Sequence, residues 1–95
     1  MLVQNRKQRS NNHRGRLDII ADILEASQNG TRKTYFMYRC NLSFKQLKYY
    51  LGFLQKKGLL YTANEGRHPQ SDLFRITDKG KEFLKAYKGL KALMK

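Results

Sequence analysis

The sequence predicts one small α+β domain that is mostly helical, with three helices, a two-stranded hairpin and a C-terminal helix in that order. Three observations lead to this prediction. The chain has 95 residues, which is the size of one domain and leaves room for only a small core. Four stretches repeat apolar residues every three or four positions, as one side of a helix does. Two short β-rich runs flank a polar loop that contains the only proline.

The first predicted helix begins at residue 16, after a tail without apolar periodicity. Residues 1–15 are rich in Asn, Gln, Arg and Ser, which is typical of a flexible basic segment. The apolar positions of the helix are Leu17, Ile20, Ala21, Ile23 and Leu24. Asn29-Gly30 is expected to end the helix, because glycine adopts the left-handed cap conformation without steric cost. We therefore expect a folded domain over residues 16–95.

Two short helices follow, separated by three residues. The first is expected from residue 32 or 33 to residue 40, with Phe36, Met37 and Cys40 on its buried side. Residues 41–43 form a tight turn, and Ser43 with Gln46 fits a capping box at the start of the next helix. Two helices joined by so short a turn form a helix-turn-helix.

The second of these helices is expected from residue 44 to about residue 57, and a glycine at residue 58 suits its end. Its predicted inner stripe consists of Phe44, Leu47, Leu51 and Leu54. Tyr49 and Tyr50 are adjacent and cannot both face inward, so we expect Tyr50 to pack and Tyr49 to be exposed. The side chains left on the outer side are Lys45, Gln46, Lys48 and Tyr49, together with Gly52.

A hairpin and a last helix complete the chain. Residues 59–63 and 72–77 are predicted strands, with Phe74 and Ile76 inward. Thr77 with Asp78 then begins the last helix. Along that helix an apolar seam repeats at intervals of four, three and four residues, and consists of Phe83, Tyr87, Leu90 and Met94. The seam continues past what one small core can bury, so we predict a homodimer; in the alternative, the helix packs on its own domain as a monomer.

The charge of the chain is strongly basic and unevenly distributed. Lys and Arg number 20 against 7 Asp and Glu, which gives a net charge of +13. Such a charge repels itself in the folded state and calls for an anionic partner. No acidic residue lies between Glu25 and Glu65, whereas seven cations do: Arg32, Lys33, Arg39, Lys45, Lys48, Lys56 and Lys57. This segregation predicts a positive face, with a merely solubilising basic surface as the alternative.

The order of elements and three stretches carry a resemblance to a known family. The stretches are MYRCNLSFKQLKYYLGFLQKKGLL, GLLYTA and FRITDKGKEFL. Over about residues 17–90 the chain resembles a winged helix-turn-helix domain, in particular the small archaeal winged-helix proteins that bind DNA. That group includes chromatin-associated proteins that dimerise through the last helix. Compared with it, the loop over residues 64–71 is longer and more basic than a minimal wing.

The resemblance implies that the chain binds double-stranded DNA, with the helix from residue 44 in the major groove and the loop as the wing. The residues expected at the DNA are Arg32, Lys33, Arg39, Ser43, Lys45, Gln46, Lys48, Tyr49, Lys56, Arg67 and His68. Gln46 can pair with adenine, although the capping box already uses its side chain, and Lys45 or Lys48 can reach guanine or a phosphate. The cations flanking the shorter helix suit phosphates, whereas those at the loop tip suit the minor groove.

We predict weakly specific DNA binding, because the lysines outnumber the plausible base readers. The role is that of a transcriptional regulator or a chromatin-architectural protein, located in the cytoplasm at the nucleoid. RNA or ribosome binding is the alternative, which would work through loops, tail and phosphates. A protein-interaction module without nucleic acid is a third reading, and the charge argues against it.

No catalytic or metal-binding arrangement is evident in the sequence. Cys40 falls on a predicted inner side, where a cysteine acts as a small apolar residue. His13 and His68 show no metal-ligand spacing with it. No apolar run approaches the ~18 residues of a membrane span. We therefore expect neither enzymatic activity nor a cofactor, a metal or a membrane partner.

Overall fold

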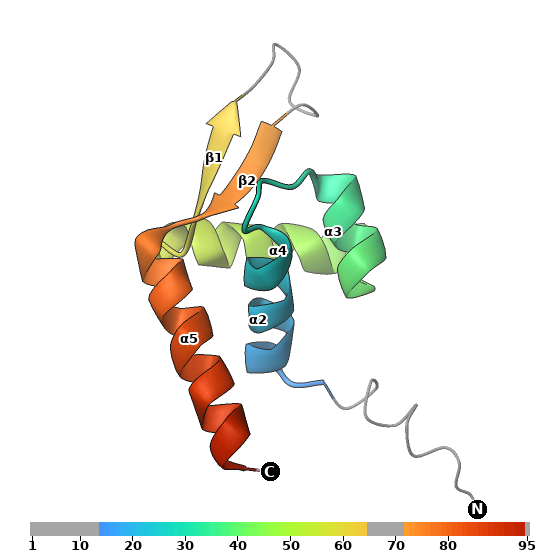
Figure 1. Ribbon diagram of the computed structural model, residues 1–95. Coiled ribbons are helices and arrows are strands. Elements are labelled where there is room, and N and C mark those ends of the chain that lie inside the picture. The colour runs from blue at the N-terminus through green and yellow to red at the C-terminus, as the bar shows by residue number, and fades with distance from the viewer. Residues whose placement is uncertain (1–13, 65–71, 95) are drawn as a thin grey trace, which may run out of the picture.

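The computed structural model describes residues 14–64 and 72–94, which form four helices and one two-stranded antiparallel sheet (Figure 1). The helices are α2 (Arg16–Ala26), α3 (Lys33–Cys40), α4 (Phe44–Lys56) and α5 (Asp78–Leu93). The strands are β1 (Leu60–Asn64) and β2 (Asp72–Ile76). The predicted fold class, α+β and mostly helical with a C-terminal helix after the hairpin, is confirmed.

Helix α2 begins where the sequence predicts and ends earlier. Its last residue is Ala26, whereas the sequence indicates an end at Asn29-Gly30. The physical reason lies in Ser27, which is fully buried and whose hydroxyl donates to the Leu24 carbonyl at 2.8 Å, closing the helix there. Gly30 still has the positive φ of +88° expected of a glycine, but in the turn that follows the helix.

Leu17 is a further departure, because it is exposed although the periodicity places it inside. It lies in the first turn of α2, before the first buried position, Ile20. Periodicity correctly assigns the following positions, Ile20, Ala21, Ile23 and Leu24, to the core.

The helix-turn-helix is confirmed in detail. Between α3 and α4, Asn41 adopts a left-handed conformation with φ 55°, and Leu42 is buried in the turn. The Ser43 hydroxyl accepts from the Gln46 N–H at 3.1 Å, and the Gln46 side-chain oxygen accepts from the Ser43 N–H at 3.0 Å. This is the predicted capping box, which pairs two amides that a helix N-terminus otherwise leaves open.

The inner stripe of α4 is only partly as predicted. Leu47, Leu51 and Leu54 are buried and Tyr50 packs with them, as expected. Phe44 does not, and 55% of its surface is exposed. It is the first residue of α4, one turn before the buried Leu47, so the core ends before reaching it.

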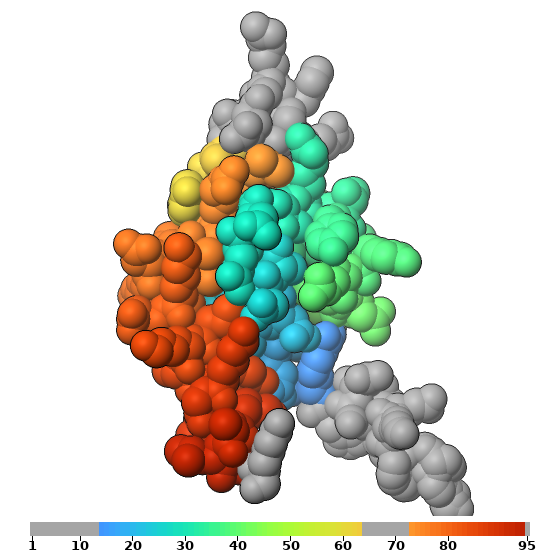
Figure 2. All heavy atoms as spheres, viewed as in Figure 1, coloured from blue at the N-terminus to red at the C-terminus, as the bar shows by residue number. Residues whose placement is uncertain are grey.

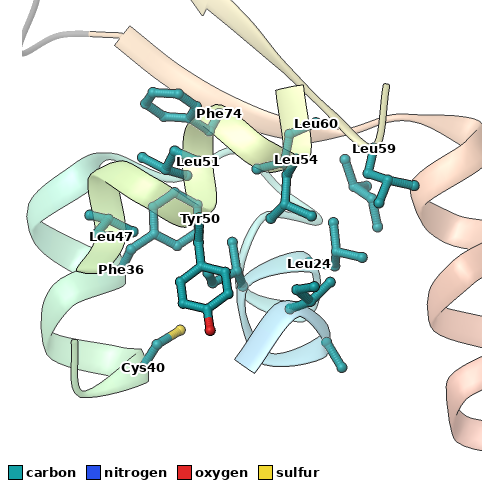
Figure 3. Packing of buried hydrophobic residues seen from close by; sticks show 14 of the residues in the cluster. Leu24, Phe36, Cys40, Leu47, Tyr50, Leu51, Leu54, Leu59, Leu60 and Phe74 are labelled. Carbon is teal, nitrogen blue, oxygen red and sulfur yellow. The ribbon is translucent and has the colours of Figure 1, made fainter. Parts of the chain in front are cut away.

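The hairpin is joined to the helix-turn-helix by one additional bridge. In the register, Leu60 pairs with Ile76 and Thr62 with Phe74. Thr31, just before α3, exchanges two backbone hydrogen bonds with Phe74, at 2.9 and 3.1 Å. The rings of Phe36 and Phe74 meet edge to face with centroids 6.1 Å apart. Side chains from α2, α3, α4 and the hairpin therefore converge on one core (Figure 3).

Helix α5 returns along α2 (Figure 1). The Thr77 hydroxyl caps it by accepting from the Gly80 N–H at 2.9 Å, as predicted. Leu84 is buried, and Phe83 and Tyr87 are partly buried against the core of their own domain. The predicted dimer seam is thus divided, because its first two residues pack within the chain and its last two, Leu90 and Met94, are exposed.

The close contact of α5 with the hairpin yields a first prediction. A Cβ at Gly80 would lie 2.4 Å from the Leu59 carbonyl oxygen and 2.7 Å from an Ile76 side-chain carbon. Gly80→Ala should lower the free energy of unfolding by about 3 kcal/mol, measured by urea denaturation. Gly89→Ala in the same helix is the matched control, since nothing lies within 4 Å of its Cβ position. It should stabilise the protein by about 0.8 kcal/mol. Equal effects at the two positions would contradict the packing.

The contact between α2 and α5 yields a prediction about pH. The Tyr87 hydroxyl donates to Asp18, and this bond, followed by that from the Gly15 N–H, lowers the pKa of Asp18 from 3.8. A pKa lowered on folding means that the stabilisation is complete above about pH 4 and is lost as the pH falls through the folded pKa. The same bond raises the pKa of Tyr87 to about 12, so it remains a donor at neutral pH.

Tyr87→Phe should therefore lower the free energy of unfolding by about 1 kcal/mol at neutral pH. The difference between variant and parent should be smaller at an acidic pH below the lowered pKa of Asp18, where its carboxyl is protonated. Urea denaturation of both proteins at the two pH values measures it. If the free energy of unfolding fell by the same amount at both pH values, the contribution of Tyr87 would come from ring packing and not from its bond to the charged carboxylate.

Candidate nucleic-acid interface

The outer side of α4 is a row of exposed side chains on a fixed support. Because Leu47, Leu51 and Leu54 anchor the opposite side, the outer residues cannot rotate inward. Besides Phe44, the exposed residues of α4 are Lys45, Gln46, Lys48, Tyr49, Gly52, Gln55 and Lys56. All the outward positions predicted from the sequence are among them, and Tyr49 is exposed while Tyr50 packs, as expected.

Helix α3 adds cations on either end. Arg32 precedes its first residue, Lys33 begins it and Arg39 lies in its last turn, and all three are exposed. The Arg39 guanidinium donates to the Tyr35 hydroxyl at 3.3 Å, which raises the pKa of Arg39. The predicted cations of α3 are thus exposed, like those of α4 in the same helix-turn-helix.

The carboxylates of α2 are neutralised elsewhere. Arg14 contacts Asp22 at 2.9 Å and also donates to the Cys40 carbonyl at 2.7 Å. Lys88 of α5 contacts Glu25 at 2.8 Å. Helices α2 and α5 lie side by side on the face seen in Figure 2, where they and α3 cover most of α4. No carboxylate lies on α3, α4 or the turn between them, although Asp22 of α2 acts electrostatically on Arg39.

Arg16 belongs to this surface and was not among the predicted contacts. Its guanidinium donates to the Tyr49 hydroxyl and lies 5.5 Å from the Tyr49 ring centroid and 5.9 Å from that of Phe53. Those two rings stack with centroids 6.5 Å apart, and Lys57 lies 5.8 Å from Phe53. No sequence pattern signals this cluster, because Arg16 is 33 positions before Tyr49 and only the packing of α2 on α4 joins them.

A hollow lies beside α4, between the start of α3 and the hairpin. Its volume is about 590 Å³. Its lining combines apolar side chains with two lysines; the lining residues are Lys33, Phe44, Leu47, Lys48, Leu51, Gly52, Gln55, Thr62 and Phe74. The exposed Phe44 therefore lines a concave surface that two lysines also line.

Two groups of the predicted DNA-contacting residues differ from the rest: one is engaged in a helix cap, and the other lies outside the described residues. Ser43 and Gln46 are exposed, but their side chains are engaged in the capping box. A two-point pairing of Gln46 with adenine would have to break the bond to the Ser43 N–H. Arg67 and His68, at the predicted tip of the wing, lie outside the described residues. So do residues 1–13 of the predicted tail.

In the described part of the chain, the thiol of Cys40 is not reactive and the candidate metal ligands do not cluster. Cys40 is buried, and this burial raises the pKa of its thiol to about 11, so it is protonated at neutral pH. Among residues 14–64 and 72–94, no group of three His, Cys, Asp or Glu side chains is placed to hold a metal ion. None of the described helices is long and apolar enough to cross a membrane.

Comparison with known proteins agrees with this architecture. The family model described as winged helix-turn-helix matches residues 13–95. Sso10a-2, a DNA-binding protein from Sulfolobus solfataricus, superposes with a TM-score of 0.74 at 23% identity, over 85% of this chain and 82% of that chain. No curated protein sequence matches.

Two further solved structures have the same fold. The MarR family transcription regulator SP03579 gives a TM-score of 0.73 at 17% identity, over 90% of this chain and 58% of that one. S. aureus MepR, solved as a complex with DNA, gives 0.69 at 15% identity, over 95% and 73%. At these identities the likeness concerns the fold.

Proposed function

This chain is a member of the winged helix-turn-helix family, and from that premise we propose that it binds double-stranded DNA as a transcriptional regulator or chromatin protein at the nucleoid. One observation carries the proposal: the outer side of α4 presents Lys45, Lys48 and Lys56 in a part of the chain without carboxylates. Two of its structural neighbours are described as a DNA-binding protein and as a DNA complex, which supports the same reading.

In the proposed complex, α4 lies in the major groove and α3 crosses the phosphate backbone. Lys45 and Lys48 reach phosphates or guanine, and the cations of α3 reach phosphates. Arg16 joins them as a phosphate contact, since Tyr49 and Phe53 hold its guanidinium beside α4. The wing, with Arg67 and His68, approaches the neighbouring minor groove.

The complex is proposed to be weakly specific. The exposed cations of the helix-turn-helix outnumber its uncommitted hydrogen-bonding groups, because the acceptor of Gln46 is used by the cap. Cations contribute mainly a sequence-independent term that depends on salt. If each protomer neutralises on the order of six phosphates, log K should fall by about five for each tenfold rise in salt.

A charge reversal on α4 tests the proposal. Lys45→Glu with Lys48→Glu should weaken the binding of a labelled duplex at least tenfold and reduce the salt slope by about two. The matched control is Lys81→Glu with Lys85→Glu on α5, which changes the net charge equally at two exposed positions. Fluorescence anisotropy at several salt concentrations measures both variants.

The same titration separates the nucleic acids. Equal losses in the α4 variant and the α5 control would mean that net charge, and not this surface, attracts DNA. Tighter binding of structured RNA than of the duplex would replace the proposal with RNA binding, because a recognition helix cannot enter the narrow major groove of A-form RNA.

We propose further that the end of α5 joins two copies of the chain. The relevant side chains are Leu90, Leu93 and Met94, which are 56%, 83% and 75% exposed. Apolar side chains exposed together mark interaction sites, and a two-fold partner would cover them. Phe83 and Tyr87 contribute to this contact only by holding α5 on its own domain.

Leu90→Glu with Leu93→Glu should convert a dimer into a monomer, because the two carboxylates would face each other across the interface. Sedimentation equilibrium at about micromolar concentrations measures the mass. The control is Leu17→Glu, which changes an exposed leucine on a different helix, α2, and should leave the dimer intact. A parent protein that sediments as a monomer contradicts the proposal.

A further inference from the structure

Phe44 is exposed at a position where an apolar ring needs an explanation. It is the first residue of α4, and 55% of its surface is exposed. Within the described residues no other aromatic ring and no cation is paired with it, whereas Tyr49, the other exposed aromatic side chain of α4, is held by Arg16 and Phe53. Among the described residues, Phe44 is thus the exposed aromatic ring of α4 that makes no aromatic or cation–π contact.

The surroundings of Phe44 favour a nucleic acid as that ligand. Phe44, Lys48 and Gly52 recur at intervals of four along one flank of α4 and line the same hollow. Gly52 has nothing within 4 Å of its Cβ position, so the surface is open at that point of the flank, about two turns after Phe44. Lys33 and Lys48 line the same hollow and add positive charge to it. An apolar ring that shares a hollow with two lysines suits the edge of a base close to phosphates.

The chemistry of the first turns of α4 narrows the choice of base. The early turns of a recognition helix lie nearest the base edges. Lys45 and Lys48 can donate to guanine or a phosphate, and the acceptor of Gln46 is used by the cap. The group in the major groove that an aromatic ring can contact is the C5 methyl of thymine, which lies on the base edge.

We propose that Phe44 makes the protein prefer thymine, by packing its ring against thymine C5 methyl groups in the major groove. This inference rests on the proposed binding of duplex DNA. It adds sequence preference to a surface whose other contacts are mainly electrostatic. The preference concerns A·T-containing steps presented to the first turn of α4, and it arises from the methyl group and not from a hydrogen bond.

Replacement of thymine by deoxyuridine tests the proposal without knowledge of a target sequence. Two duplexes of about 20 base pairs, about two helical turns, are compared: alternating dA and dT, and alternating dA and dU. They share phosphates, minor-groove atoms and hydrogen-bonding edges and differ in the C5 methyl. The parent protein should bind the thymine duplex about fourfold more tightly for each protomer, which corresponds to burial of one methyl group.

Phe44→Ala should bring the ratio of the two affinities close to one, mainly by weakening the binding of the protein to the thymine duplex. Phe44→Leu should keep part of the preference, because it remains apolar. Tyr38→Ala on α3 is the matched control, since it removes an aromatic side chain that is 84% exposed and should leave the ratio unchanged. Circular dichroism and thermal unfolding establish that each variant is folded.

A second pair of duplexes restores the methyl on another base. Alternating dG and dC is compared with the same duplex carrying 5-methylcytosine, whose methyl also lies in the major groove. The parent should prefer the methylated duplex, and Phe44→Ala should not.

The outcomes are distinct. Binding of both A·T and A·U duplexes with equal affinity would overturn the role of Phe44 and leave the proposed function in place. Persistence of the thymine preference in Phe44→Ala would also overturn it, as would an equal loss of affinity for all duplexes. Failure of the parent to bind any duplex would overturn the proposed function, and the inference with it.

Discussion

The burial of one side of α4 is the constraint on which the rest of this protein depends. Leu47, Leu51 and Leu54 sit in the centre of the only core that the described chain forms, with α2, α3 and the hairpin packed around them. A chain of this size cannot form a second core. The stripe therefore positions the other elements, and it also decides which residues of α4 remain in water.

The hairpin is held to the helix-turn-helix by local contacts at Phe74. Its backbone pairs with Thr31, and its ring meets Phe36 of α3. Because one residue is tied to the segment before α3 and to α3 itself, the base of the hairpin has a defined direction relative to α4. A wing can act together with a recognition helix only if this direction is fixed.

Charge is separated by the same packing. Two carboxylates of α2 stabilise its contact with α5: Asp18 accepts from Tyr87, and Glu25 pairs with Lys88. The third, Asp22, pairs with Arg14, which also donates to the Cys40 carbonyl of α3. The seven cations between residues 32 and 57 share a stretch of the chain that contains no carboxylate. A separated charge both attracts a polyanion and orients it.

The sequence by itself determined the elements and most of their sides, because these depend on local signals. Ser43 with Gln46, Thr77, and the spacing of leucines fixed where helices begin and which way they face. Tertiary structure decided the rest: α2 closes at a buried Ser27, Arg16 meets Tyr49, and Leu17 and Phe44 lie outside the core. Periodicity assigns a residue to one side of a helix, but whether a neighbouring element reaches that turn depends on how the helices are placed in space.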